Sequence, residues 1–124
     1  MKASFSAAFA LATLAPPALA QGNDFTLTYH VERTPAARLT ITSCGNAVAQ
    51  VARRSGLSVG VESFPGKLVI VKGGKAGSGA FVVQCITVDN TTVSVVQGID
   101  YRSQKASLGR FADTAFAAVK AAIR

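Results

Sequence analysis

Two cysteines and one histidine are the residues of this chain best suited to nucleophilic or redox chemistry. Cys44 lies in the segment TSCGNAVAQVARR, near the expected start of a helix, where backbone amides and the helix dipole favour a thiolate. Paired with His30, it would form a Cys–His catalytic or redox centre. The sequence contains no C-x-x-C motif, however, and nothing in it brings His30 close to Cys44.

A disulfide between Cys44 and Cys85 is the other interpretation of the two cysteines. A pair of cysteines oxidises and stays oxidised once a protein has left the reducing cytosol. Closing a loop of about 40 residues stabilises a fold by roughly 4 kcal/mol on chain-entropy grounds. We predict this disulfide; a small thiol-based enzyme or redox protein using Cys44 with His30 is the alternative function.

The segment GGKAGSG, residues 73–79, combines glycine and lysine after an apolar run, as phosphate-binding loops do. A P-loop would need glycine where Val69 stands and a hydroxyl residue where Ala76 stands. The residues that follow, AFVVQCITV, are typical of a strand rather than a helix. We therefore predict a hairpin loop rather than a nucleotide site.

The remaining chemistry-bearing residues form no recognisable set. His30 lies on the polar side of an alternating segment, which is typical of a surface histidine. We predict no metal and no cofactor, since the ligand spacings of known sites are missing. The pattern favours a non-enzymatic role. The six carboxylates are scattered along the chain: Asp24, Glu32, Glu62, Asp89, Asp100 and Asp113.

The first 20 residues, MKASFSAAFALATLAPPALA, indicate export. One cation, Lys2, precedes an apolar run of about 13 residues, shorter than the roughly 20 that span a bilayer. The run ends in an A-x-A cleavage pattern, so we predict a signal peptide at 1–20, cut between Ala20 and Gln21. A single domain would occupy 21–124, periplasmic or secreted, with no membrane-spanning segment.

The charge of the chain is strongly positive. The formal net charge is +7, and removal of Lys2 leaves +6. Such a domain attracts polyanions, and an acidic envelope component fits a periplasmic location better than nucleic acid does. Solubility alone is the other explanation of the charge. The candidate anion-binding residues lie near expected loops: Lys67, Lys72, Lys75, Arg102, Lys105 and Arg110.

Periodicity predicts the elements. Residues 24–33 alternate and predict a half-buried strand whose apolar face, with Phe25, Leu27, Tyr29 and Val31, packs on the core. A helix capped by Thr42 or Ser43 follows and ends at Gly56. Residues 57–63, 67–73, 80–88 and 93–102 predict an antiparallel meander, and Ser107 caps an amphipathic final helix.

This β-α-β-(β)-β-β-α order predicts an α+β fold, a four- or five-stranded antiparallel sheet with two helices on one face. Polar residues should then cover the other face, yet Val82 and Ile86 flank Gln84 there. A homodimer through the sheet face or an apolar ligand would cover such a surface. Twisted strands that tolerate exposed valine are the alternative.

The segments YHVERTPAARLTI, GAFVVQCITVD and VSVVQGIDYR resemble those of a family of short exported proteobacterial proteins classed as a domain of unknown function. The resemblance extends from about Asp24 to the end of the chain. It implies export and a compact domain, and it brings no assigned activity and no catalytic residues.

Overall fold

The computed structural model of the chain describes residues 24–124, so the predicted signal peptide and its cleavage site at Ala20 and Gln21 lie outside the described residues. Five strands and two helices follow one another: β1 (Thr26–Pro35), α1 (Ile41–Arg54), β2 (Ser58–Phe64), β3 (Leu68–Lys75), β4 (Gly79–Val88), β5 (Thr91–Asp100) and α2 (Ser107–Ala121).

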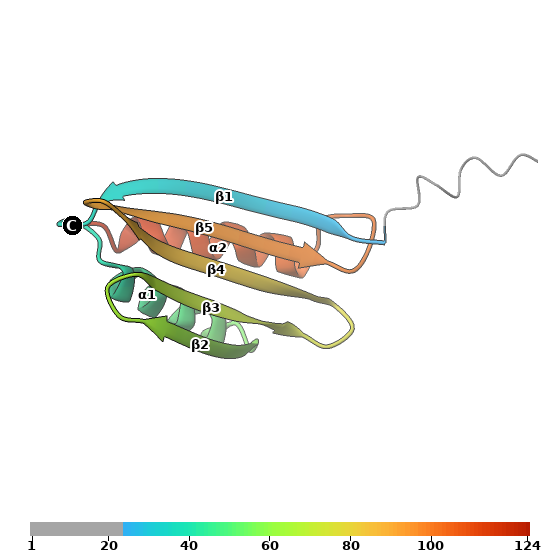
Figure 1. The fold of residues 1–124 in the computed structure, drawn as a ribbon. Coiled ribbons are helices and arrows are strands. Elements are labelled where there is room, and N and C mark those ends of the chain that lie inside the picture. The colour runs from blue at the N-terminus through green and yellow to red at the C-terminus, as the bar shows by residue number, and fades with distance from the viewer. Residues whose placement is uncertain (1–23) are drawn as a thin grey trace, which may run out of the picture.

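The strands form one antiparallel sheet in the order β1-β5-β4-β3-β2. The meander β2 to β5 adds each strand beside its predecessor, and β1 pairs along its whole length with β5, from Thr26 opposite Asp100 to Pro35 opposite Thr91. Both helices lie on the same face, with α1 behind β2 and β3 and α2 behind β5 (Figure 1). The predicted α+β fold is confirmed, with five strands.

The core fills the space between the sheet and the helices. Phe81 and Val83 of β4 point toward the helices, and the ring of Phe81 packs on that of Phe111 at 4.8 Å between centroids. Each helix presents an apolar stripe at helical spacing to this layer, as its periodicity requires. The fully buried members of the two stripes are Cys44, Val48, Ala52, Leu108, Ala112, Ala115 and Val119.

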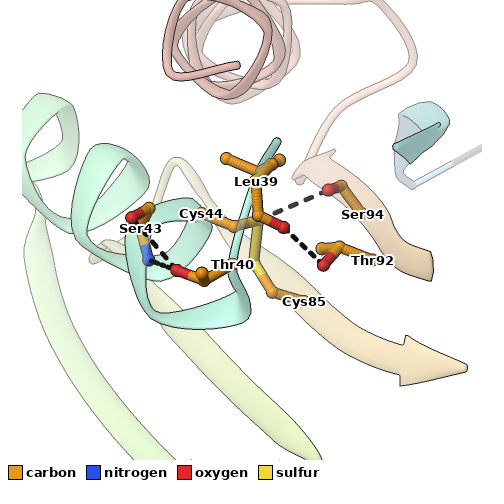
Figure 2. Close-up of a disulfide and its surroundings, with 7 residues drawn as sticks. All are labelled: Leu39, Thr40, Ser43, Cys44, Cys85, Thr92 and Ser94. Carbon is orange, nitrogen blue, oxygen red and sulfur yellow. Dashed lines mark hydrogen bonds between the residues drawn. A yellow bond between two sulfur atoms is a disulfide. The ribbon is translucent and has the colours of Figure 1, made fainter. Parts of the chain in front are cut away.

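The predicted disulfide ties α1 to β4 at the centre of this core (Figure 2). The Cα atoms of Cys44 and Cys85 lie 6.2 Å apart, the two residues are separated by 41 positions, and both are fully buried. Ser94 on β5 places its hydroxyl 3.4 Å from the Cys44 sulfur. The bond therefore joins the first turn of a helix to the middle strand of the sheet.

The start of α1 differs from the sequence prediction. Thr40 is the N-cap, and its hydroxyl accepts a hydrogen bond from the Ser43 amide at 3.0 Å. The predicted caps Thr42 and Ser43 lie inside the first turn instead. The reason is that Ile41 is buried and shares the apolar stripe with Cys44, so the helix begins at Ile41 and its cap precedes it.

The segment 73–79 is the predicted hairpin. β3 ends at Lys75 and β4 begins at Gly79, with the Ser78 amide bonded to the Lys75 carbonyl at 3.0 Å. Gly77 has a φ of +77°, which glycine adopts without steric cost. A strand rather than a helix follows the loop in the chain, so the strand–loop–helix geometry of a phosphate-binding loop is missing.

The N-terminus of α2 is bound by the carboxylate of Asp100 rather than by the predicted cap, Ser107. The carboxylate accepts hydrogen bonds from the amides of Ala106 at 2.8 Å and of Leu108 and Gly109 at 2.9 Å. Asp100 is the last residue of β5 and is fully buried. A side chain from the neighbouring strand therefore satisfies amides that a local cap would otherwise serve.

Candidate functional site

Strand β1 directs its apolar side chains into solvent, which is the reverse of the sequence prediction. Leu27, Tyr29 and Val31 are 49%, 65% and 53% exposed, whereas Thr28 and His30 lie on the helix side and are half-buried. The physical reason lies in the position of β1 at the sheet edge, beside polar groups of α2. The polar face of β1 meets those groups, and the apolar face joins the side of the sheet that no helix covers.

We call this uncovered side of the sheet the open face; in Figure 1 it is the side turned away from the two helices. Residues paired across neighbouring strands point to the same side, so the register defines its rows. One row runs from Val31 through Val95 and Gln84 to Ile70. The apolar side chains of the open face come from all five strands: Leu27, Tyr29, Val31, Phe64, Leu68, Ile70, Val82, Ile86, Val93, Val95 and Ile99.

Charged groups on the open face stand on its edge strands, except Lys72, which stands on β3 beside the edge strand β2. Lys72 and Glu62 pair with each other at 3.3 Å on the β2–β3 side. Arg33 stands at the opposite corner, where it lines a cavity of about 450 Å³ together with Asp89 and three neighbours. Between these borders the polar side chains are the uncharged Gln84 and Gln97. A monomer rarely exposes so continuous an apolar surface without using it to bind.

A polar cluster connects β1 to α2 on the helix side. His30 Nε2 lies 2.8 Å from one carboxylate oxygen of Asp113, and Lys105 Nζ lies 2.6 Å from the other. The hydrogen bond from Lys105, followed by that from His30, lowers the pKa of Asp113 below its usual value. The His30 ring also stacks on Phe116 at 4.5 Å. His30 is thus bound to a structural carboxylate, not to a Ser, Thr or Cys nucleophile.

A basic cavity lies between the β3–β4 hairpin and the helices. Lys75 and Arg110 line it, and its volume is about 280 Å³. The rest of the lining comes from Ser55, Leu57, Ser107, Phe111 and Thr114. The hydroxyls of Ser55 and Thr114 donate to the backbone carbonyls of Val51 and Arg110. The arrangement suits a single acidic group on a partly apolar body, since two cations border an apolar patch.

The other predicted anion-binding residues do not join this cavity. Lys72 and Lys105 are each paired with a carboxylate, Glu62 and Asp113 respectively. Lys67 lies in the turn between β2 and β3, and Arg102 follows β5. Of the six residues that the sequence selected, the structure therefore brings Lys75 and Arg110 to one cavity.

The sequence profile of a family of unknown function, DUF6180, matches residues 24–124. The chain belongs to this family. No curated protein and no solved structure matches the chain. The matched range covers every element from β1 to α2, so the open face and the basic cavity both lie within the DUF6180 domain.

One motif of this DUF6180 domain escaped the sequence analysis. GLSVG, residues 56–60, fits the G-x-S-x-G pattern of serine hydrolases. That pattern works on a strand-to-helix elbow, whereas here α1 precedes it and β2 follows it. The Ser58 hydroxyl donates to the Gly74 carbonyl at 3.0 Å. Ser58 therefore supports the β2–β3 pairing and is not placed as a nucleophile.

The Cys44–His30 pair left open by the sequence is not formed. The Cys44 sulfur is bonded to Cys85, and His30 is bound to Asp113. Across residues 24–124, no three His, Cys, Asp or Glu side chains gather in a way that could hold a metal ion. Over the same range, no helix has the length and apolar character needed to cross a membrane.

Proposed function

We propose that this DUF6180 domain is an exported, non-enzymatic interaction domain that binds its partner through the open face. The supporting observation is the orientation of β1. Its three apolar side chains continue the apolar surface of β5 and β4 on the side of the sheet that the helices leave uncovered. Removing apolar surface from water contributes about 25 cal/mol per Å², so a partner that covers this face is strongly favoured.

The shape of the open face favours a partner of macromolecular size. Small-molecule sites are concave and enclose most of their ligand. The open face is a sheet surface, and the cavity that touches it lies at a corner between Arg33 and Asp89, away from the apolar centre. A broad apolar surface with charges at its borders matches the anatomy of a protein–protein interface.

Export is supported by the N-terminal sequence and by the cysteines. The predicted cleavage after Ala20 would release a chain that begins at Gln21, and a buried disulfide suits an oxidising compartment. Mass spectrometry of the protein recovered from the periplasm of an expressing bacterium tests this part. We expect a chain starting at Gln21 with no free thiol; a chain starting at Met1 would overturn export by this route.

The interaction surface can be tested by site-specific photo-crosslinking in the exporting cell. A benzophenone amino acid replaces Tyr29 or Val82 on the open face and, as a matched control, Ser63, an exposed strand residue opposite the buried Val69 on the helix side. We expect a discrete adduct from both open-face positions and none from Ser63. Absence of adducts, or equal adducts at all three positions, would overturn the proposal.

A second candidate function, binding of an acidic envelope component, is favoured by the basic cavity. The meeting of Lys75 and Arg110 in one cavity suits a carboxylate or phosphate. Binding to vesicles of anionic phospholipid and to a soluble polyuronate should be measured at low and high salt. We expect salt-sensitive binding that Arg110→Gln weakens and Lys67→Gln preserves. Unchanged binding in both variants would rule out the cavity as the binding site, and absence of salt-sensitive binding would indicate that the charge serves solubility alone.

A further inference from the structure

We infer that the partner of the open face is a second copy of this chain, so that two open faces pack against each other in a symmetric homodimer. The inference rests on the proposed function and specifies its partner. Three features of the open face point to self-association: its area, its low charge, and the kind of polar group at its centre.

The area of the open face matches the requirement of a stable dimer. Strands of up to ten residues, roughly 33 Å long, and five strands about 4.8 Å apart give a face of roughly 700 Å². A specific protein interface buries about 800 Å² on each partner. Two open faces packed in the aligned manner of a β-sandwich would therefore form an interface of standard size.

The charge distribution allows two copies of a strongly basic chain to meet on this side. Because each copy carries a formal +7 before processing, most other contacts between copies would bring cations together. On the open face Lys72 is compensated by Glu62, and the other charged strand residue is Arg33, at a corner on the edge strand β1. Self-repulsion is thus smallest where the apolar area is largest.

The polar groups at the centre are suited to a two-fold axis. β4 is the middle strand, so the middle of β4 meets the same residues of its copy in any symmetric dimer that covers the whole face. Gln84 lies there. An amide both donates and accepts hydrogen bonds, so it can pair with its own copy, whereas a charged group at this position would repel its copy.

Sedimentation velocity across a range of concentrations tests the inference on the protein expressed from its full sequence and purified without reductant. We expect a dimer. Tyr29→Lys and Val95→Lys should each weaken self-association at least tenfold, because they place like charges in an apolar interface. Ser63→Lys adds the same charge on the helix side and should leave the dimer intact.

If Val95→Lys fails to fold, Tyr29→Lys alone still tests the dimer. Tyr29 is 65% exposed in the single chain, so a lysine there should not disturb folding. Crosslinking adds a positional readout. Residues 24–124 contain no free cysteine, so Gln84→Cys introduces a single thiol into them that a short bismaleimide should link to its copy. Ser63→Cys should give no linked dimer.

The outcomes separate this inference from the proposed function. A monomer at all concentrations, or a dimer unaffected by both lysine variants, would overturn the homodimer. Photo-adducts of another mass at Tyr29 and Val82 would then leave the interaction function standing. If native mass spectrometry shows a monomer that carries a small apolar molecule, the homodimer is likewise overturned, and the open face binds a ligand instead of a second copy. Absence of any open-face adduct would overturn both proposals.

Discussion

Asp100 shows how a single side chain can fix the position of a whole helix. Burial alone raises the pKa of this carboxyl, but hydrogen bonds from the amides of Ala106, Leu108 and Gly109, together with the charge of Arg110, outweigh burial and lower it. The ionised form is therefore the one that the fold stabilises. Three amides near the start of α2 donate hydrogen bonds to this carboxylate.

We predict that Asp100→Asn lowers the free energy of unfolding at pH 7 by about 1–3 kcal/mol, since a buried amide cannot replace three charge-assisted bonds. The folded pKa of Asp100 lies below the unfolded value of about 3.9. Its stabilisation is hence fully present above that value and is lost as the pH falls through the folded pKa. Urea denaturation between pH 7 and pH 2 should show the two proteins converging in acid.

Asp24→Asn, at an exposed position, is the control and should match the wild type at every pH. A difference between wild type and Asp100→Asn that stays constant into acid would contradict an ionised Asp100. The sequence could not assign this role, because Ala106 lies six positions after Asp100 and local patterns do not show which amides the carboxylate reaches. Local capping rules selected Ser107, the nearest hydroxyl residue, instead.

At the scale of elements, the close approach of α2 to β5 depends on Gly98. A Cβ atom built there would overlap the Leu108 carbonyl oxygen and lie 2.9 Å from the Ala112 Cβ atom. The helix backbone cannot move aside for this Cβ atom, whereas the end of a flexible side chain could. The same approach brings the first amides of α2 within reach of Asp100, two residues along β5.

We predict that Gly98→Ala destabilises the protein by about 1–3 kcal/mol through overpacking. Gly60→Ala is a matched control on β2, because a Cβ atom there would lie 3.9 Å from its nearest neighbour, the Lys72 backbone oxygen, which is an ordinary contact. Thermal and urea unfolding of both variants measure the difference. Equal stabilities would show that α2 can move away from the sheet without cost.

The disulfide acts between elements, joining α1 to the middle strand. We predict that the double substitution Cys44→Ala and Cys85→Ala lowers the free energy of unfolding by roughly 4 kcal/mol, because the unfolded chain regains the freedom of a loop of about 40 residues. Urea denaturation without reductant measures it. The wild type treated with reductant after unfolding should show a comparable loss; a loss below about 1 kcal/mol would contradict a stabilising role.

The helices and strands were largely predictable from the sequence. Which side of each strand faces the helices was only partly predictable. The alternation of Val69 with Ile70 and of Val83 with Val82 correctly indicated that β3 and β4 are apolar on both sides. The same kind of alternation in β1 was assigned the wrong way round, because periodicity distinguishes two faces of a strand without saying which faces the helices. Tyr29 points outward since the core side of β1 is occupied by the polar cluster of α2.

At the scale of the whole molecule, the proposed self-association and the charge would act in opposite directions, and their response to salt separates them. After the predicted cleavage the chain would carry +6, which is +7 less Lys2, so two copies would repel at long range while burial of their open faces would favour contact. Added salt screens the repulsion and leaves apolar burial in place. Binding of an acidic group in the cavity of Lys75 and Arg110 has the opposite dependence, since there the attraction itself is screened.

We therefore predict that raising the salt concentration from about 20 mM to about 500 mM tightens the homodimer and weakens the binding of anionic vesicles in the same preparation, because the Debye length falls from roughly 20 Å to roughly 4 Å.

Because a dimer is stabilised by mass action, its unfolding midpoint should also rise with protein concentration, and more steeply at high salt. Tyr29→Lys should abolish the concentration dependence of the unfolding midpoint and keep vesicle binding. Arg110→Gln should keep the concentration dependence and weaken vesicle binding. If added salt weakens both the self-association and the vesicle binding, the self-association is electrostatic and does not occur through the open face.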